Sequence, residues 1–268
     1  MLSYQHGYHA GNLADVHKHA LLAWTLDYLT QKPKPLSYIE THAGRGLYDL
    51  NAPEARKTGE AAQGIGRAAD WFAADHPYAR ALSAVRAQHG PGAYPGSPLI
   101  AATLLRADDP LVLAEAHPAE HAALLRALPM RTLPPGTQIR HEDGFAMARA
   151  VVPPTPRRGL MVIDPSYELP ADYERLPPFI AAMARKWPVG IILLWYPILS
   201  DARHGSMLSA LQVVHPDALR HEVRFPPARP GHRMTGSGLF VVNPPWGLSE
   251  EAATLARRFA SLAPNPRS

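Results

Sequence analysis

Strand-sized apolar runs alternate with helix-sized segments along most of this chain, and the alternation limits the folds that it can adopt. Runs rich in Val, Ile and Leu, such as residues 159–163, are typical of strands buried on both faces. Helical segments between such runs favour a parallel sheet with right-handed crossovers. Residues 226–237, which join the last two runs, are too few for a helical crossover, so these two strands should pair as a hairpin. We predict strands at residues 36–40, 111–115, 137–141, 159–163, 190–195, 219–225 and 238–243, and helices at residues 14–31, 98–106, 118–128, 144–150, 172–186, 201–214 and 249–262.

The predicted fold is therefore α/β, with a seven-stranded, mostly parallel sheet whose last strand is antiparallel. Residues 47–94 break the alternation, because they contain no strand-like run and have helical patterns at residues 60–72 and 78–88. We interpret this stretch as a small helical insertion. The predicted domains are thus a core made of residues 1–46 and 95–268 and an insertion subdomain made of residues 47–94.

Composition excludes several classes of protein. The 268 residues include no Cys, which excludes disulfides and Cys-based zinc sites. The N-terminus lacks the apolar core of a signal peptide, and the longest apolar runs are too short to span a bilayer. We therefore expect a cytoplasmic protein without a membrane partner, and a monomer. The formal net charge of +4 permits a polyanionic partner without requiring one.

Histidines near the N-terminus raise the hypothesis of a metal site. His6, His9, His17 and His19 lie close to Asp15 in the sequence. However, a helix would point His17 and His19 to different faces, and no His-Glu-x-x-His spacing occurs. We predict no metal.

Polar residues follow four of the predicted strands where each strand ends: His42–Gly46, Glu115, Asp143–Gly144 and Asp164–Tyr167. Ligands of open α/β sheets bind beyond the carboxyl ends of the strands, so this pattern predicts a nucleoside pocket. Glu115 could hold a ribose, or it could cap the next helix. Asp143 could contact an adenine edge, or it could be a helix N-cap.

The most informative of these strand ends reads Asp164-Pro165-Ser166-Tyr167. Such a turn offers a planar amine a carboxylate, a backbone carbonyl and an aromatic stacking face, which is what methylation of an exocyclic nucleobase nitrogen requires. The alternative is a strand that ends in a proline turn with a surface Tyr. Asn243-Pro-Pro-Trp246 has a similar pattern, but it follows the antiparallel strand, and Asn cannot accept a proton; we interpret it as a structural turn.

Motifs spread over nearly the whole chain resemble those of the bacterial 23S ribosomal RNA adenine-N6 methyltransferases (the RlmJ-like family), which have a Rossmann-like class I methyltransferase fold. The matching motifs are Met1-Leu-Ser-Tyr-Gln-His-Gly-Tyr-His-Ala-Gly-Asn12, Asp15-Val-His-Lys-His19, Thr41-His-Ala-Gly44, Tyr94-Pro-Gly-Ser-Pro98, Glu115-Ala-His-Pro118, Asp143-Gly-Phe145, Asp164–Tyr167, Leu194-Trp-Tyr-Pro197 and Asn243-Pro-Pro-Trp246. The family turn is usually Asp-Pro-Pro-Tyr, so Ser166 departs from the pattern. We expect a less rigid turn rather than lost chemistry.

The resemblance implies S-adenosylmethionine as cofactor and an adenine of 23S ribosomal RNA as substrate. It implies cofactor contacts for Lys18, His19, His42, Gly44, Ser97, Glu115, Asp143, Gly144 and Asp164. It implies that Asp164 is the catalytic acceptor and that Tyr4 helps to hold the target base. The chemistry of the turn adds Pro165, whose carbonyl oxygen can accept an N–H of the amine, and Tyr167, which can stack on the base. An adenine-N6 DNA methyltransferase and a non-enzymatic RNA-binding protein on the same fold remain as alternatives.

Basic side chains that could contact RNA are Lys18, Arg45, Arg56, Lys57, Arg67, Arg229, His232 and Arg233. Each of them alone could be an ordinary solvated surface charge. The loop with Arg229 and Arg233, between the last two strands, should border the active-site face. We therefore predict that these two arginines bind the RNA substrate.

Overall fold

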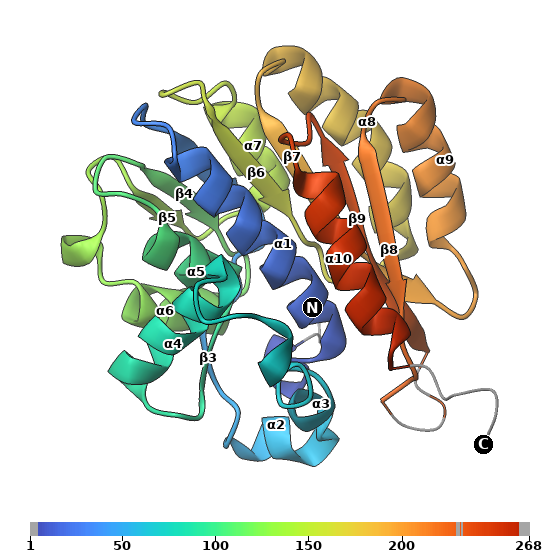
Figure 1. Cartoon of the computed structure of the whole chain (residues 1–268). Helices are drawn as coiled ribbons and strands as arrows, with labels where there is room; N and C mark the ends of the chain where they lie inside the picture. Colours follow the sequence, from blue (N-terminus) through green and yellow to red (C-terminus); the bar gives the residue numbers. More distant parts are fainter. Residues whose placement is uncertain (1–4, 229–230, 232, 263–268) are drawn as a thin grey trace.

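The computed structural model describes residues 5–228, 231 and 233–262. Its main sheet has seven strands in the order β5-β4-β1-β6-β7-β9-β8, and only β9 runs in the direction opposite to the other six (Figure 1). The strands are β1 (Ser37–Glu40), β4 (Leu111–Ala114), β5 (Gln138–Arg140), β6 (Gly159–Ile163), β7 (Ile191–Leu199), β8 (Leu219–Arg224) and β9 (Met234–Val242). The predicted sheet, with a single reversed strand at the end of the chain, is confirmed.

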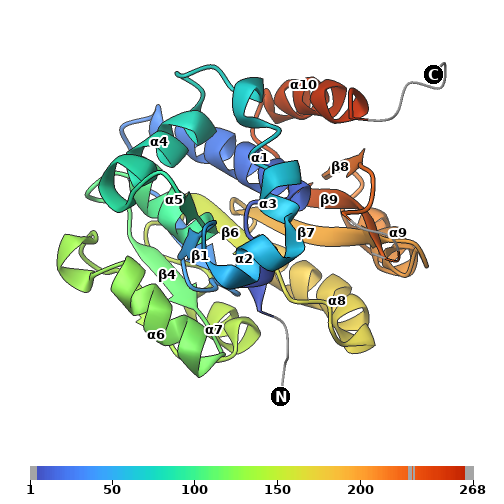
Figure 2. The ribbon, with the colours of Figure 1, turned by 90° about the horizontal axis from the view of Figure 1, so that it is seen from below.

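Helices cover both faces of this sheet, as the view from below shows (Figure 2). One face is covered by α1 (Leu13–Thr30), α4 (Pro77–His89), α5 (Ser97–Leu104) and α10 (Leu248–Ala260), and the other by α7 (Gly144–Val151), α8 (Pro170–Lys186) and α9 (His204–Val214). α6 (Pro118–Ala127) connects β4 to β5. Each face has its own hydrophobic core, so the sheet is the middle of three layers.

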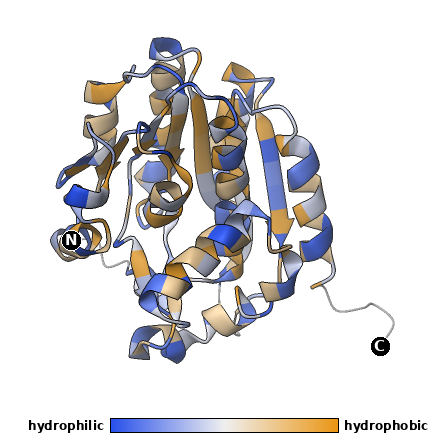
Figure 3. Ribbon diagram, turned by 60° about the vertical axis from the view of Figure 1, so that its left-hand side comes forward, coloured by the Kyte–Doolittle hydropathy of each residue, from blue (hydrophilic) through white to orange (hydrophobic). Residues whose placement is uncertain are grey.

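The central strand β6 shows why this segment folds as it does. Leu160 and Val162 belong to the core under α1, whereas Met161 and Ile163 belong to the core under α8. Successive side chains of a strand point to opposite faces, so a strand buried on both sides must be apolar throughout. Figure 3 shows the central strands as mostly hydrophobic, between helices of mixed character.

α1 is buried along most of its length, which differs from the predicted amphipathic helix. Asn12 caps it by accepting a 2.9 Å hydrogen bond from the Asp15 backbone. The helix is enclosed by the sheet and by α4, α5 and α10, so its polar residues Asp15, His17, Lys18 and His19 are buried as well. Buried charged groups need partners, and these residues therefore have specific contacts in the site described below.

The segment between β1 and α5 contains two short strands, so the prediction that it has none is wrong. β2 (Leu47–Asp49) pairs with β3 (Ala93–Pro95) in a separate two-stranded sheet. The predicted helix at residues 60–72 is also wrong: α2 (Pro53–Thr58) and α3 (Glu60–Gln63) are followed by a turn and the 3₁₀ helix η2 (Ala69–Trp71). Gly64 ends α3 with a non-helical ψ of −107°, and a Cβ there would lie 2.1 Å from the Gly11 carbonyl oxygen, so this position requires glycine.

The second predicted helix of this segment corresponds to α4, which packs against α1 and α5. The division into a core and an insertion subdomain stays a prediction. Two further 3₁₀ turns are η1 (His6–Tyr8), before α1, and η3 (Met130–Thr132), before β5. Within the described residues, no helix combines the length and apolar character that a membrane crossing requires.

Candidate active site

A cavity of about 670 Å³ opens at the carboxyl ends of the parallel strands, where all four predicted strand ends meet. Its volume is in the usual range for a small-molecule site. Eleven residues that the sequence analysis assigned to cofactor binding or catalysis line it: Lys18, His19, His42, Gly44, Ser97, Glu115, Asp143, Gly144, Asp164, Pro165 and Tyr167. The parallel strands bring these residues to one edge of the sheet, as expected.

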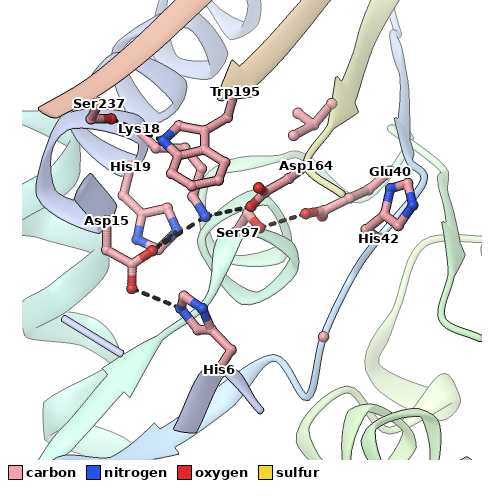
Figure 4. A network of polar contacts seen from close by, with 12 residues as sticks. His6, Asp15, Lys18, His19, Glu40, His42, Ser97, Asp164, Trp195 and Ser237 are labelled. Atoms are coloured by element: carbon pink, nitrogen blue, oxygen red, sulfur yellow. Dashed lines mark hydrogen bonds and ion pairs between the residues drawn. The ribbon is translucent and has the colours of Figure 1, made fainter. Parts of the chain in front are cut away.

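At the centre of the cavity, Lys18 from α1 forms an ion pair with Asp164 from the end of β6 (Figure 4). The Lys18 Nζ is 2.6 Å from Asp164 Oδ2 and 3.2 Å from Asp15 Oδ1. The other oxygen of Asp15 is 2.9 Å from His6 Nε2 and accepts a hydrogen bond from the Gly11 backbone. The catalytic acid predicted from sequence is thus the end of a charged network that begins in the N-terminal segment.

Burial and charge act in opposite directions on this network. Burial alone would raise the pKa of Asp15, but the neighbouring His6 and Lys18 lower it well below its ordinary value. Burial also disfavours the charged form of Lys18, yet the carboxylates of Asp164 and Asp15 raise its pKa. The result is an ammonium that stays protonated between two carboxylates.

His19 is neutral in this setting. It is almost completely buried, and its Nδ1 is 2.9 Å from the Tyr94 hydroxyl. Burial lowers the pKa of His19 to about 3. Its Nε2 makes no hydrogen bond within the described part of the chain, and the Asp15 carboxylate is 3.8 Å away. A buried polar atom of this kind at a cavity wall is suited to contact a polar ligand.

Glu40, at the end of β1, does not line the cavity itself but supports the lining residue Ser97, a contact that the sequence analysis missed. Its carboxyl group receives hydrogen bonds from the Ser97 and Tyr38 hydroxyls, and Glu40 is fully buried. Burial raises the pKa of Glu40 to about 8. Its position follows the rule that identified the other strand ends, so the signal was present in the sequence.

Glu115 and Asp143 each fulfil a structural role in addition to facing the cavity. Glu115 accepts hydrogen bonds from the Gly44 backbone at 2.8 Å and from the His117 backbone at 2.7 Å. Asp143 caps α7 by accepting from the Ala146 backbone at 2.8 Å. The capping interpretation is therefore confirmed for Asp143, whereas α6 is capped by His117 and not by Glu115. The hydrogen bonds also fix both carboxylates at the cavity, where they retain acceptor capacity.

His42 and Gly44 lie in the loop that follows β1. The His42 Nδ1 is 2.8 Å from the Thr41 hydroxyl, and burial lowers the pKa of His42 to about 4. Gly44 has a φ of 63°, and a Cβ there would lie 2.8 Å from the Tyr48 hydroxyl. This position therefore favours glycine, and the backbone can approach a ligand closely.

Tyr167 is held in place rather than exposed, which excludes the interpretation of a surface Tyr. Its φ is 55°, its hydroxyl donates to the Trp195 carbonyl oxygen at 2.6 Å, and only 7% of its surface is exposed. Its ring packs against Tyr173 and Trp195. These contacts fix the ring of Tyr167, and the expectation that Ser166 makes the turn less rigid stays a prediction.

Asn243 lies at the opposite edge of the sheet, as predicted for a structural turn. Val242 pairs with Ile192 near the start of β7, which places the end of β9 away from the cavity. The Asn243 side chain donates to the carbonyl oxygens of Pro188 and Gly190 at 2.9 and 2.8 Å. It is therefore not a second catalytic turn.

Only some of the residues predicted to contact RNA lie in the described part of the chain. Tyr4, Arg229 and His232 lie outside the described residues. Arg233 is exposed and pairs with Asp201, and the next residue, Met234, lines the cavity. Arg45 is bound by Glu120 through two hydrogen bonds, of 2.9 and 2.6 Å, which makes it a structural contact in this conformation.

The residues of the cavity fit an adenosyl cofactor. Carboxylates at Glu115 and Asp143 offer acceptors for a ribose and an amine, the Ser97 hydroxyl offers a further polar contact, and Phe145 offers an apolar wall. At Gly144 a Cβ would lie 1.8 Å from the Thr41 carbonyl oxygen, so the backbone is tightly packed at the cavity wall. In the described part of the chain, no group of three or more His, Asp or Glu side chains is arranged to hold a metal.

The sheet order, with its one reversed strand between β7 and β8, and the cavity at the strand ends define a class I methyltransferase. A family model described as "Ribosomal RNA large subunit methyltransferase D, RlmJ" matches residues 33–264. The chain belongs to this family. This membership confirms the predicted enzyme class and supports S-adenosylmethionine as its cofactor.

Similar proteins agree with this assignment. Ribosomal RNA large subunit methyltransferase J of Escherichia coli is 37% identical over 94% of this chain and 90% of its own length. The protein of the same name from Haemophilus influenzae is 36% identical, with the same coverage. A crystal structure of a Legionella pneumophila protein matches 95% of this chain and 94% of its own, with a TM-score of 0.84 and 33% identity.

Proposed function

We propose that this protein transfers a methyl group from S-adenosylmethionine to the N6 amine of an adenine in 23S ribosomal RNA. The observation that carries this proposal is the Asp164-Pro165 turn at the cavity, with Asp164 held by Lys18. The names of the two curated relatives supply the class of RNA. We further propose that the protein acts as a monomer in the cytoplasm.

Different residues of the cavity would bind different parts of the cofactor. Glu115 would bind the ribose hydroxyls, and Asp143 and Gly144 would contact the adenine. Ser97, His19 and His42 would hold the methionine end, with Lys18 close by. When bound, S-adenosylmethionine supplies an electrophilic methyl group on its sulfonium.

Asp164 and Pro165 act on the target amine. Adenine N6 is a poor nucleophile because its lone pair is delocalised into the ring. The Lys18 ammonium engages Asp164 Oδ2, which leaves Oδ1 to accept an N–H of the amine, while the Pro165 carbonyl oxygen accepts the other. Both acceptors stabilise the positive charge that develops on the nitrogen, and such contributions are typically worth ~10²–10⁴ in rate.

The target base must leave its stack to reach this cavity, since an adenine inside a duplex cannot enter it. Tyr167 lines the cavity beside Asp164 and offers an aromatic surface there. Base stacking on an aromatic side chain contributes roughly 1–3 kcal/mol. Tyr4 would contact the base from the N-terminal segment.

The decisive experiment is transfer of tritiated methyl groups from S-adenosylmethionine to protein-free 23S RNA, with 16S RNA and duplex DNA in parallel, followed by nucleoside analysis. N6-methyladenosine in 23S RNA alone supports the proposal. Label in DNA would instead assign the chain to adenine-N6 DNA methyltransferases. Cofactor binding without label in any substrate would contradict activity on protein-free RNA.

A further inference from the structure

His17, Ser237 and His221 form a buried hydrogen-bonded row that reaches the catalytic cavity through Trp195. The Trp195 Nε1 donates to Ser237 Oγ at 2.9 Å, and Ser237 Oγ is 2.8 Å from His17 Nδ1. The His17 Nε2 is in turn 2.9 Å from His221 Nδ1. His17 and Ser237 are both fully buried, and the proposed methyl transfer does not use either of them.

The hydroxyl of Ser237 sets the direction of the protons in this row. The hydroxyl accepts the indole N–H, so its own proton needs an acceptor, and His17 Nδ1 is at hydrogen-bond distance. His17 must then carry its proton on Nε2, which donates to His221 Nδ1. Burial, together with the neighbouring His221, lowers the pKa of His17, which keeps this ring neutral. In this arrangement each donor from the Trp195 indole to His17 Nε2 has an acceptor.

Three neighbouring elements bring the row together. Ser237 pairs with Pro197, two residues after Trp195, so β7 and β9 place both side chains on the face covered by α1. His17 and Lys18 are consecutive in α1 and therefore point about 100° apart. One helix turn thus presents Lys18 to Asp164 and His17 to Ser237.

The indole that the row holds touches the catalytic residues. The Lys18 Nζ is 5.5 Å from the centre of the Trp195 ring, within the range of a cation–π contact. The Tyr167 hydroxyl donates to the Trp195 carbonyl oxygen, and the two rings are 5.9 Å apart. Figure 4 shows the indole between Ser237 on one side and Lys18 on the other. A rotated indole would remove one wall of the Lys18 site.

We propose that Ser237 and His17 are positioning residues for methyl transfer, which hold the Trp195 indole against the Lys18 ammonium and so maintain the Lys18–Asp164 pair. This proposal rests on the proposed function, because its main readout is turnover. It also predicts a spectroscopic effect that does not depend on turnover, since the indole N–H loses its acceptor when Ser237 is replaced.

The test compares Ser237→Ala and His17→Phe with the unaltered protein. We expect kcat to fall about tenfold in each, which corresponds to ~1.4 kcal/mol, while the Kd of S-adenosylmethionine measured by calorimetry stays within about twofold. The Trp195 emission, taken as the difference from Trp195→Phe, should shift in both. Ser237→Thr keeps the hydroxyl, and His17→Asn keeps an acceptor near the Nδ1 position, so both should restore most of kcat.

Two controls separate positioning from stability. Ser209→Ala removes an exposed hydroxyl on α9 that bonds only the Gly205 carbonyl oxygen among the described residues, and it should change neither kcat nor emission. In a Trp195→Phe background, Ser237→Ala should have no further effect on kcat, because the group that it positions is gone. The comparison in the Trp195→Phe background remains a test of the proposal if Ser237→Ala in the otherwise unaltered protein does not fold.

Unchanged kcat per folded molecule and unchanged Trp195 emission in both variants would overturn the proposal, even if stability fell. A large loss of cofactor affinity would overturn it too, because the row would then serve the cofactor site. If the unaltered protein methylates no RNA, the proposed function fails, and the emission of Trp195 still decides whether the row holds the indole.

Discussion

The Lys18 Nζ lies 2.6 Å from Asp164 Oδ2, and this contact joins the first helix to the end of β6 across 146 residues of sequence. Asp15, on the same helix, is the second carboxylate of the ammonium. Lys18 therefore orients Asp164 while its own position is fixed by Asp15. Asp164 makes no other side-chain hydrogen bond in the described part of the chain, which leaves Oδ1 for the substrate amine.

Asp164→Asn should abolish most turnover and leave cofactor binding intact. The amide keeps the size of the side chain but loses the charge that stabilises the developing positive nitrogen, so we expect a rate loss of ~10²–10⁴. Single-turnover methyl transfer and calorimetric titration with S-adenosylmethionine measure the two quantities. A variant with unchanged turnover would exclude Asp164 as the acceptor.

Asn243→Ala is the matched control at the other motif. Asn243 has a φ of 54° and bonds two carbonyl oxygens, so its loss should reduce the free energy of unfolding by about 1–3 kcal/mol. Methyl transfer per folded molecule should not change. If the variant folds normally but no longer transfers methyl groups, the Asn243 turn would be part of the catalytic site.

Glu40→Gln should change the pH dependence of stability. Burial raises the pKa of Glu40 from an ordinary value of 4.5 to about 8, so the folded state binds this proton more tightly than the unfolded state. The contribution of Glu40 is therefore fully present below pH 4.5 and is lost as the pH rises to about 8, at up to ~1.4 kcal/mol per pH unit. Glutamine carries no such proton, so the variant should gain stability relative to the unaltered protein over this interval.

Urea unfolding of the cofactor-free protein at pH 5 and pH 8.5 checks this expectation. Asp70→Asn, at an exposed acid in η2, serves as a control whose stability difference should stay nearly constant. If the Glu40→Gln difference is equally constant, Glu40 does not carry a raised pKa in the folded protein.

The sheet could be predicted from sequence where its strands are buried on both faces. β6 has the bounds that its apolar run indicates, because Arg158 precedes the run and Asp164-Pro165 ends it. β2 and β3 could not be predicted in this way. They are three residues long, and their pairing depends on contacts between positions more than forty residues apart. Local pattern carries no information on such pairs.

The site residues likewise differ in whether local sequence patterns could predict their contacts. Glu115, Asp143 and Asp164 could be placed together because parallel strands share one edge. The Lys18–Asp164 contact depends on how α1 crosses the sheet, and the Trp195–Ser237 contact depends on the register of β7 and β9. Neither is visible in the spacing of residues along the chain.

Gly144→Ala should damage the cavity, whereas Gly205→Ala should stabilise the protein. Both glycines lie in the first turn of a helix. A Cβ at Gly144 would lie 1.8 Å from the Thr41 carbonyl oxygen, but a Cβ at Gly205 meets nothing within 4 Å. We expect a loss of at least ~1–3 kcal/mol at Gly144, with weaker cofactor binding, and a gain of about 0.4–1 kcal/mol at Gly205. Thermal unfolding measures the stability of both variants, and cofactor titration measures their affinity. Equal effects of the two substitutions would show that the Thr41 carbonyl oxygen does not restrict the side chain at position 144.

Arg229→Ala/Arg233→Ala should weaken RNA binding without changing cofactor affinity. Arg233 precedes Met234 at the cavity, and its exposed guanidinium pairs with Asp201, a contact that a phosphate can replace. Each lost phosphate contact should lower the slope of log K against log salt by about one unit. Filter binding of a 23S RNA fragment over a salt series measures this slope. Arg257→Ala, on the exposed face of α10, should leave it unchanged. A double variant with the slope and affinity of the unaltered protein would exclude this loop from the RNA interface.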